Sequence, residues 1–265
     1  MTEPTVITEL DSRGVATVRL NRPAKHNAFD DSVIAELNKA FTDLAENSEV
    51  RIVVLASEGK SFSAGADLGW MQRMATYSRE ENLEDARALA AMLQKLNNMP
   101  QPTIARVQGA AYGGAVGLVS CCDIAVGSSK ARFCLSEVKI GLIPATISPY
   151  VIAAMGQRAA RRYFTTAEVI AAEQALHLGL LSELVGVDEL DDAVEAHIYA
   201  LLANGPQAVR DAKRLVLDYA DRAVDEALIE DSCERIADIR VSDEGQAGLQ
   251  AFLEKKPAPW SNSDV

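Results

Sequence analysis

The sequence is poor in several residue types, and each shortage argues against a class of function. It has 3 histidines in 265 residues. His26, His177 and His197 share no metal-ligand spacing, so we expect surface or packing roles for them and no metal site. The 26 Lys and Arg are outnumbered by 38 Asp and Glu, for a formal net charge of −12. That charge argues against nucleic acid as a partner, although a few local cations would suffice for an anionic small ligand.

Cysteine is also scarce, and long apolar runs are absent. The four cysteines have no CxxC or metal-ligand spacing, which predicts reduced and mostly buried thiols and a cytoplasmic location: Cys121, Cys122, Cys134 and Cys233. Met1–Pro4 has neither the basic nor the apolar region of a signal peptide. No apolar run approaches the ~20 residues that span a bilayer, so we expect no membrane segment.

The sequence instead repeats a strand–turn–helix pattern typical of an α/β fold. A hairpin is predicted around Ser12–Gly14, and Asp30 can cap the helix that follows it. The apolar run Arg51–Ala56 predicts a strand buried on both faces. The chain becomes mostly helical after Glu173. We therefore predict a core over residues 1–189 and a helical assembly region over 190–265.

Two stretches of small residues each lie between a predicted strand and a predicted helix. They are Phe62–Leu68 and Gly109–Ala115. Small residues let the backbone approach a ligand, and a helix start leaves N–H groups unpaired. If the two turns face each other, they can offer one N–H each to a carbonyl oxygen, as in an oxyanion hole. No Ser-His-Asp or Cys-His set accompanies them, which favours an enolate over a tetrahedral acyl intermediate.

Glu137 is the candidate acid or base, because it stands in the otherwise apolar stretch 133–138. Burial there would raise its pKa and suit it to proton transfer, whereas an edge-strand glutamate would simply face water. Capping a helix is the favoured role of Asp67, and Asp123 is interpreted as a structural partner. The basic residues of 158–162 indicate a solvated helix face, with phosphate binding as the alternative.

Six segments together resemble the crotonase, or enoyl-CoA hydratase/isomerase, superfamily over nearly the whole chain. Their order and spacing carry the resemblance: Asn21–Pro23 with Asn27-Ala28, Phe62–Leu68, Val107–Gly114, Cys122–Ala125, Gly141–Pro144 and Phe252–Pro257. The resemblance implies a crotonase-like spiral of ββα units with a C-terminal helical region. It also implies assembly as a homotrimer or a dimer of trimers.

The resemblance further implies an acyl-CoA substrate and assigns its contacts. The N–H groups of Ala64 and Gly114 would hold the thioester oxygen, and Glu137 would be the base. The coenzyme A portion, which is part of the substrate and not a separate cofactor, would contact residues of the first turn, one upstream lysine and the C-terminal segment of a neighbouring subunit: Lys25, Ala64, Gly65, Ala66, Asp67, Leu68, Phe252 and Lys255 or Lys256. The first of the family's two usual glutamates falls on Gly117, which leaves that position vacant.

Three longer stretches, Phe62–Met71, Tyr112–Val119 and Leu135–Tyr150, are similar to the bacterial hydratases of 3-methylglutaconyl-CoA and isohexenylglutaconyl-CoA, which function in leucine and acyclic-terpene breakdown. The implied activity is a hydro-lyase that adds water to a 3-branched glutaconyl-CoA. One alternative is an enoyl-CoA isomerase that uses a single glutamate. Another is a catalytically silent scaffold or RNA-binding family member, against which the net charge and the presence of Glu137 both argue.

Overall fold

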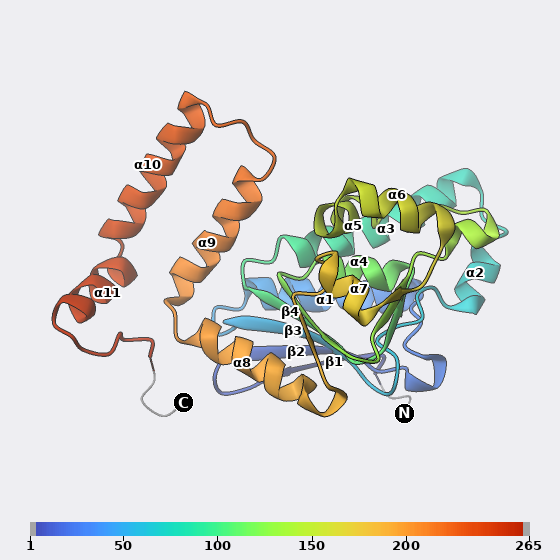
Figure 1. The fold of residues 1–265 in the computed structure, drawn as a ribbon, viewed down its shortest axis with the longest axis horizontal. Coiled ribbons are helices and arrows are strands. Elements are labelled where there is room, and N and C mark those ends of the chain that lie inside the picture. Colours follow the sequence, from blue (N-terminus) through green and yellow to red (C-terminus); the bar gives the residue numbers. More distant parts are fainter. Residues whose placement is uncertain (1–3, 262–265) are drawn as a thin grey trace. The chain divides into compact units, whose positions relative to one another are not determined.

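The computed structural model describes residues 4–261, which divide into two compact units (Figure 1). The first contains the chain up to Met99 and Thr103–Val194, and the second contains Pro100–Pro102 and the chain from Glu195 onward. The division thus falls inside helix α8 (Leu190–Leu202), a few residues beyond the predicted boundary at 189. No helix within residues 4–261 combines the length and apolarity needed to cross a membrane.

The first unit is built on a six-stranded sheet whose strand order is β1-β2-β3-β4-β6-β9. The first pair is the predicted hairpin and is antiparallel, and every later pair is parallel. The strands are β1 (Val6–Leu10), β2 (Val15–Leu20), β3 (Ile52–Ser57), β4 (Thr103–Val107), β6 (Ile124–Ser128) and β9 (Glu183–Val185). All six residues of β3 are buried, which confirms the strand predicted to be covered on both faces.

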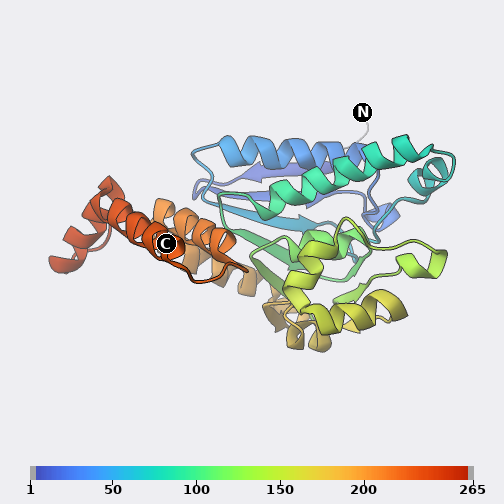
Figure 2. The ribbon, with the colours of Figure 1, turned by 90° about the horizontal axis from the view of Figure 1, so that it is seen from above.

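A smaller sheet and a set of helices complete this unit. The order of the second sheet is β5-β7-β8, with β5 (Ala110–Tyr112), β7 (Arg132–Cys134) and β8 (Ile170–Ala171). Helices α1 (Asp31–Glu46) and α3 (Arg79–Asn97) pack together over one face of the large sheet (Figure 2). The others are η1 (Pro23–Lys25), α2 (Leu68–Met74), α4 (Gly114–Ser120), η2 (Glu137–Ile140), α5 (Ser148–Met155), α6 (Gln157–Thr166), α7 (Ala172–His177) and η3 (Val187–Glu189).

The second unit is helical, as predicted for this part of the chain. After α8 it contains α9 (Pro206–Tyr219), α10 (Glu226–Val241) and α11 (Asp243–Leu253). The Glu244 carboxylate accepts hydrogen bonds from the backbone N–H groups of Gln207 and Ala208, so α11 satisfies the free N–H groups at the start of α9. Several large apolar side chains of this unit are exposed, among them Val216, Val241 and Leu253.

Candidate active site

The two turns of small residues are in direct contact. Ser63 and Ala111 form an isolated parallel β-bridge between them. Gly65, with a φ of +87°, lies so close to the second turn that a Cβ atom placed on it would be 2.7 Å from the carbonyl oxygen of Tyr112. Glycine is required at 65 both for this approach and for the left-handed backbone.

Phe29 determines which way the backbone of the first turn points. It forms a parallel bridge with Ala66, in which the Phe29 N–H donates to the Gly65 oxygen and the Asp67 N–H donates to the Phe29 oxygen, both at 2.9 Å. In such a bridge the paired residue directs its own N–H to the opposite side. The Ala66 N–H therefore points away from Phe29, and it has no acceptor among residues 4–261.

Gly114 contributes the second free N–H. It is the first residue of α4, where no intrahelical acceptor exists, and residues 4–261 supply no other acceptor for its N–H. Its backbone packs on the buried ring of Phe29, because a Cβ placed on Gly114 would lie 2.7 Å from the ring Cζ. Phe29 thus contacts both segments that carry a free N–H.

The predicted role of Ala64 as an oxyanion donor is wrong. Its N–H donates to the carbonyl oxygen of His26 at 2.9 Å and is already used. The left-handed Gly65 turns the chain between positions 64 and 66, so the free N–H of this turn belongs to Ala66. Ala66 was predicted only as a coenzyme A contact, because small-residue composition cannot indicate which of several N–H groups is paired.

Glu137 is placed beside the second turn. It begins the 3-10 helix η2, which is separated from the end of β7 by two residues. Its Oε1 would lie 3.3 Å from a Cβ placed on Gly113, the neighbour of Gly114. Its Oε2 is buried and has no hydrogen-bond partner among residues 4–261, and burial raises the pKa of this carboxyl above its usual range. A buried carboxylate oxygen without a partner is unusual in a structural role, since leaving it unsatisfied is costly.

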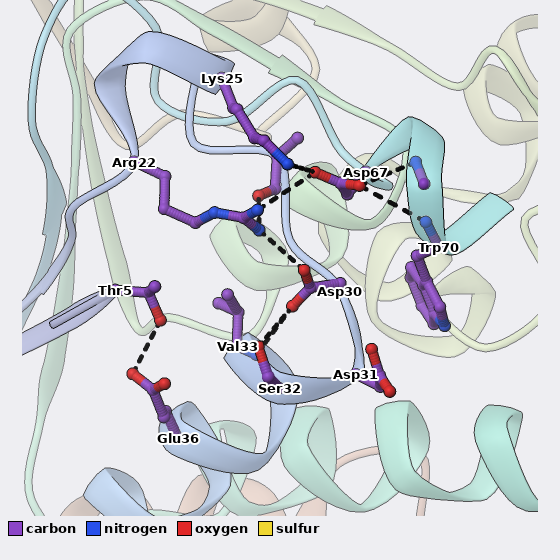
Figure 3. Close-up of polar contacts among 12 residues, drawn as sticks. Thr5, Arg22, Lys25, Asp30, Asp31, Ser32, Val33, Glu36, Asp67 and Trp70 are labelled. Atoms are coloured by element: carbon purple, nitrogen blue, oxygen red, sulfur yellow. Dashed lines mark hydrogen bonds and ion pairs between the residues drawn. The ribbon is translucent and has the colours of Figure 1, made fainter. Parts of the chain in front are cut away.

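A charged cluster borders the first turn (Figure 3). Asp67 caps α2 by accepting from the N–H groups of Gly69 and Trp70, which confirms the predicted cap. The same carboxylate accepts from Lys25 Nζ at 2.9 Å and from Arg22 at 3.2 Å. The hydrogen bond from Lys25 is the main reason that the pKa of Asp67 is lowered, despite its burial. Lys25, predicted to contact coenzyme A, is 58% exposed at its side chain while it makes this ion pair.

The position of the missing first glutamate carries no carboxylate, and it has no open space for one. Gly117 is buried in α4, and a Cβ placed on it would lie 2.3 Å from Cγ2 and 2.8 Å from Cβ of Ile147. Ile147 is 1% exposed and branched at Cβ, so it has little freedom to move aside. The predicted lack of a carboxylate at this position therefore goes with a lack of space, because a residue thirty positions along the chain fills the site where a side chain would lie.

The remaining predicted residues are distributed over both units. Leu68 of the first turn is exposed, and Phe252, Lys255 and Lys256 lie in the second unit, where Phe252 is 79% exposed and Lys256 pairs with Glu254. Their contacts with coenzyme A stay predictions. The structural interpretation of Asp123 is confirmed by its hydrogen bonds from the backbone N–H and hydroxyl of Thr103.

Sequence reasoning missed the roles of Arg22 and Phe29. Arg22 belongs to a segment that carries the resemblance and Phe29 directly follows one, but neither was assigned a function. Their partners lie far along the chain: Arg22 contacts Asp67, which is 45 positions away. The spacing of residues within one segment carries no signal for such contacts.

Comparisons with known proteins identify the family of this chain. The sequence model of the family described as Enoyl-CoA hydratase/isomerase matches residues 11–263. The structure superposes on an enoyl-CoA hydratase from Shewanella pealeana with a TM-score of 0.94 and 48% identity, covering 97% of this chain and 96% of the other. This similarity confirms the expected crotonase-type α/β fold with its C-terminal helices.

Two curated relatives cover nearly the full length. A crotonyl-CoA hydratase of Syntrophomonas wolfei is 30% identical over 92% of this chain and 93% of its own. A short-chain-enoyl-CoA hydratase of Clostridium acetobutylicum is 30% identical over 95% of each chain. With a family match over almost all of its residues and the paired turns that hold two free N–H groups, this chain belongs to the enoyl-CoA hydratase/isomerase family.

Proposed function

We propose that the chain is a hydro-lyase that adds water across the α,β double bond of an acyl-CoA ester. The observation that carries the proposal is the unpartnered, buried Oε2 of Glu137, beside the turn that holds the free N–H of Gly114. A base of raised pKa next to an oxyanion site is the arrangement that proton transfer to and from an enolate requires.

In the proposed mechanism the N–H groups of Ala66 and Gly114 donate to the thioester oxygen. The Glu137 carboxylate takes one proton from water, and the resulting hydroxide bonds to Cβ of the substrate. The electron pair of the double bond moves toward the carbonyl, and the two N–H groups stabilise the enolate oxygen that forms. The protonated Glu137 then returns its proton to Cα, so that one molecule of water is added and the carboxylate is regenerated.

One carboxylate performs both proton transfers in this scheme. Position 117 cannot supply a second one, because it is a glycine packed against Ile147. The raised pKa of Glu137 suits this double use, since it brings the protonated and the ionised forms closer in free energy at neutral pH.

For the substrate we propose a 3-branched glutaconyl-CoA, with a methyl or an isohexenyl group at C3. Lys139 lies two residues after Glu137 in η2 and is exposed, so we take it as the partner of the distal carboxylate of such a substrate. Ile140, Leu142 and Ile143 follow directly and are 58%, 54% and 72% exposed. Exposed apolar side chains beside a cation would suit a substrate that carries both an apolar branch and a carboxylate.

A hydration assay on three esters tests the proposal. We expect turnover of 3-methylglutaconyl-CoA or isohexenylglutaconyl-CoA to exceed that of crotonyl-CoA, which lacks both the branch and the distal carboxylate. Preference for crotonyl-CoA would refute the proposed substrate class but not the proposed hydration reaction. Failure to hydrate any of the three would refute the proposed reaction.

A single-glutamate enoyl-CoA isomerase is the second candidate. The packing of Ile147 on Gly117 favours it, because moving a proton between two carbons needs one carboxylate and no bound water. An assay with a straight-chain 3-enoyl-CoA separates the two reactions. Isomerisation without hydration would identify the protein as an enoyl-CoA isomerase.

We also propose that the protein works in the cytoplasm as a homotrimer or a dimer of trimers and carries no resident cofactor. Assembly is supported by the exposed apolar side chains of the second unit, such as Val216 and Val241, at 67% and 76% exposure. Apolar side chains this exposed favour burial against another surface. Light scattering at several concentrations tests the assembly.

A further inference from the structure

The guanidinium of Arg22 lies between two acidic helix caps (Figure 3). Asp30 accepts from the Val33 N–H and caps α1, and Asp67 caps α2. One terminal nitrogen of Arg22 donates to Asp30 at 3.1 Å, and the other donates to Asp67 at 3.2 Å. The three side chains are 16%, 17% and 8% exposed, so these charges are held largely out of water.

These contacts surround the bridge that orients the Ala66 N–H. Arg22 also donates to the carbonyl oxygen of Ala28 at 2.9 Å, so it holds both neighbours of Phe29. On the opposite side it holds Asp67, the neighbour of Ala66. The bridge between Phe29 and Ala66 rests on two backbone hydrogen bonds, and one guanidinium connects the residues that flank it.

From this geometry we propose that Arg22 is a positioning residue for the oxyanion donor at Ala66. It acts through the backbone and does not touch the substrate. The inference rests on the proposed function, in which the Ala66 N–H binds the thioester oxygen. Arginine is required because its planar fork reaches two carboxylates and a carbonyl together, which the point charge of a lysine cannot do.

Lys25 has a different relation to the same carboxylate. It also donates to Asp67, but its side chain is 58% exposed and, within residues 4–261, that side chain forms no hydrogen bond with Asp30 or Ala28. Lys25 can therefore leave Asp67 for a phosphate of coenzyme A while Arg22 keeps the two segments together. The buried arginine therefore positions the backbone, and the exposed lysine binds the phosphate.

The test uses a readout that reports on the thioester oxygen directly. A 4-(dimethylamino)cinnamoyl-CoA ester absorbs at longer wavelength when hydrogen bonds polarise its carbonyl group. In Arg22→Gln we expect most of this red shift to be lost. The kcat for hydration of the enoyl-CoA substrate should fall roughly tenfold to a hundredfold, the scale of a misplaced catalytic group. Affinity for free coenzyme A should be unchanged, because that ligand lacks the thioester.

Arg19→Gln is the matched control, since Arg19 on β2 is also ion-paired, with Glu9 and Glu58, but does not contact the bridge. It should keep the red shift and kcat. A folded Arg22→Gln with the wild-type red shift would overturn the inference, whatever its kcat. If Arg22→Gln does not fold, Arg22→Lys carries the test: a reduced red shift supports the proposal and a full one overturns it.

The outcomes separate this inference from the proposed function. If the wild-type protein red-shifts the bound ester but hydrates no enoyl-CoA, the proposed hydration reaction is refuted and the proposed oxyanion site stands. Wild-type protein that binds the ester without any red shift would overturn the inference.

Discussion

Ile147 fills the space beside Gly117, where a side chain at that position would have to lie, with its Cγ2 at 2.3 Å from a Cβ placed on the glycine. Gly117→Glu alone should therefore destabilise the fold, because it overpacks the core and buries a charge. We expect a loss of about 1–3 kcal/mol or more in the free energy of unfolding, measured by urea denaturation. A variant as stable as wild type would show that Ile147 moves aside.

A companion change tests whether position 117 can serve catalysis. In Gly117→Glu combined with Ile147→Ala, the removed side chain leaves room for the carboxylate. We expect partial recovery of stability and a gain in crotonyl-CoA hydration relative to Ile147→Ala alone, since two carboxylates form the acid/base pair of ordinary hydratases. If the double variant gains no hydration, position 117 does not face the substrate.

Glu137→Gln should keep binding of the ester and reduce turnover at least ~100-fold, the usual scale for a positioned base. Because wild-type Glu137 must be ionised to accept a proton from water, kcat/KM should fall as the pH falls through its raised pKa. A pH–rate profile and calorimetric binding measure both effects. Near-normal turnover in the folded variant would assign the chemistry to another group.

Glu137→Gln should also change how the stability of the folded protein depends on pH. Burial raises the pKa of Glu137 in the folded state, so the folded protein holds this proton more tightly than the unfolded chain. Wild-type stability should therefore decrease as the pH rises from the unfolded pKa to the folded one, and this loss should be missing in Glu137→Gln. The variant should unfold at a higher temperature than wild type at pH 8. Equal pH dependence in both proteins would contradict the proposed burial.

Amide-to-ester replacement distinguishes Ala66 from Ala64. Incorporating lactic acid at position 66 removes that N–H and should cost roughly 100-fold in kcat, as for one oxyanion donor. The matched replacement at position 64 removes the N–H that donates to His26, which should lower stability more than kcat. The reverse pattern in the two kcat values would restore Ala64 as the donor.

The sequence was sufficient for features that depend on local pattern. A continuous apolar run predicted β3, and acidic residues before helices predicted the caps at Asp30 and Asp67. It was insufficient where the outcome depends on residues distant in the chain. The free N–H of the first turn depends on the bridge to Phe29, and the space at Gly117 is filled by Ile147. Neither relationship has a periodic or compositional signal.

Lys139→Gln should reduce selectivity for the substrate and leave the chemistry intact. If Lys139 pairs with a distal carboxylate, the variant should raise KM for 3-methylglutaconyl-CoA up to about fivefold, the scale of an exposed ion pair, and leave crotonyl-CoA unaffected. Lys130→Gln, which changes another lysine between β6 and β7, is the control for net charge. An equal rise in KM for both esters would indicate a general effect and remove Lys139 from acyl recognition.

Substitution of Lys256 tests the predicted contact of the C-terminal segment with coenzyme A. Lys256 is exposed on the second unit and pairs with Glu254, so a phosphate must compete with that carboxylate. We expect Lys256→Gln to weaken coenzyme A binding by up to about fivefold at low salt. The difference from wild type should shrink as salt rises, because the attraction is screened. Lys39→Gln, which changes a lysine paired with Asp43 on α1, should bind as wild type does. Calorimetry at two salt concentrations measures both variants, with light scattering to verify an unchanged assembly. Wild-type affinity in Lys256→Gln at low salt would remove this lysine from the binding site.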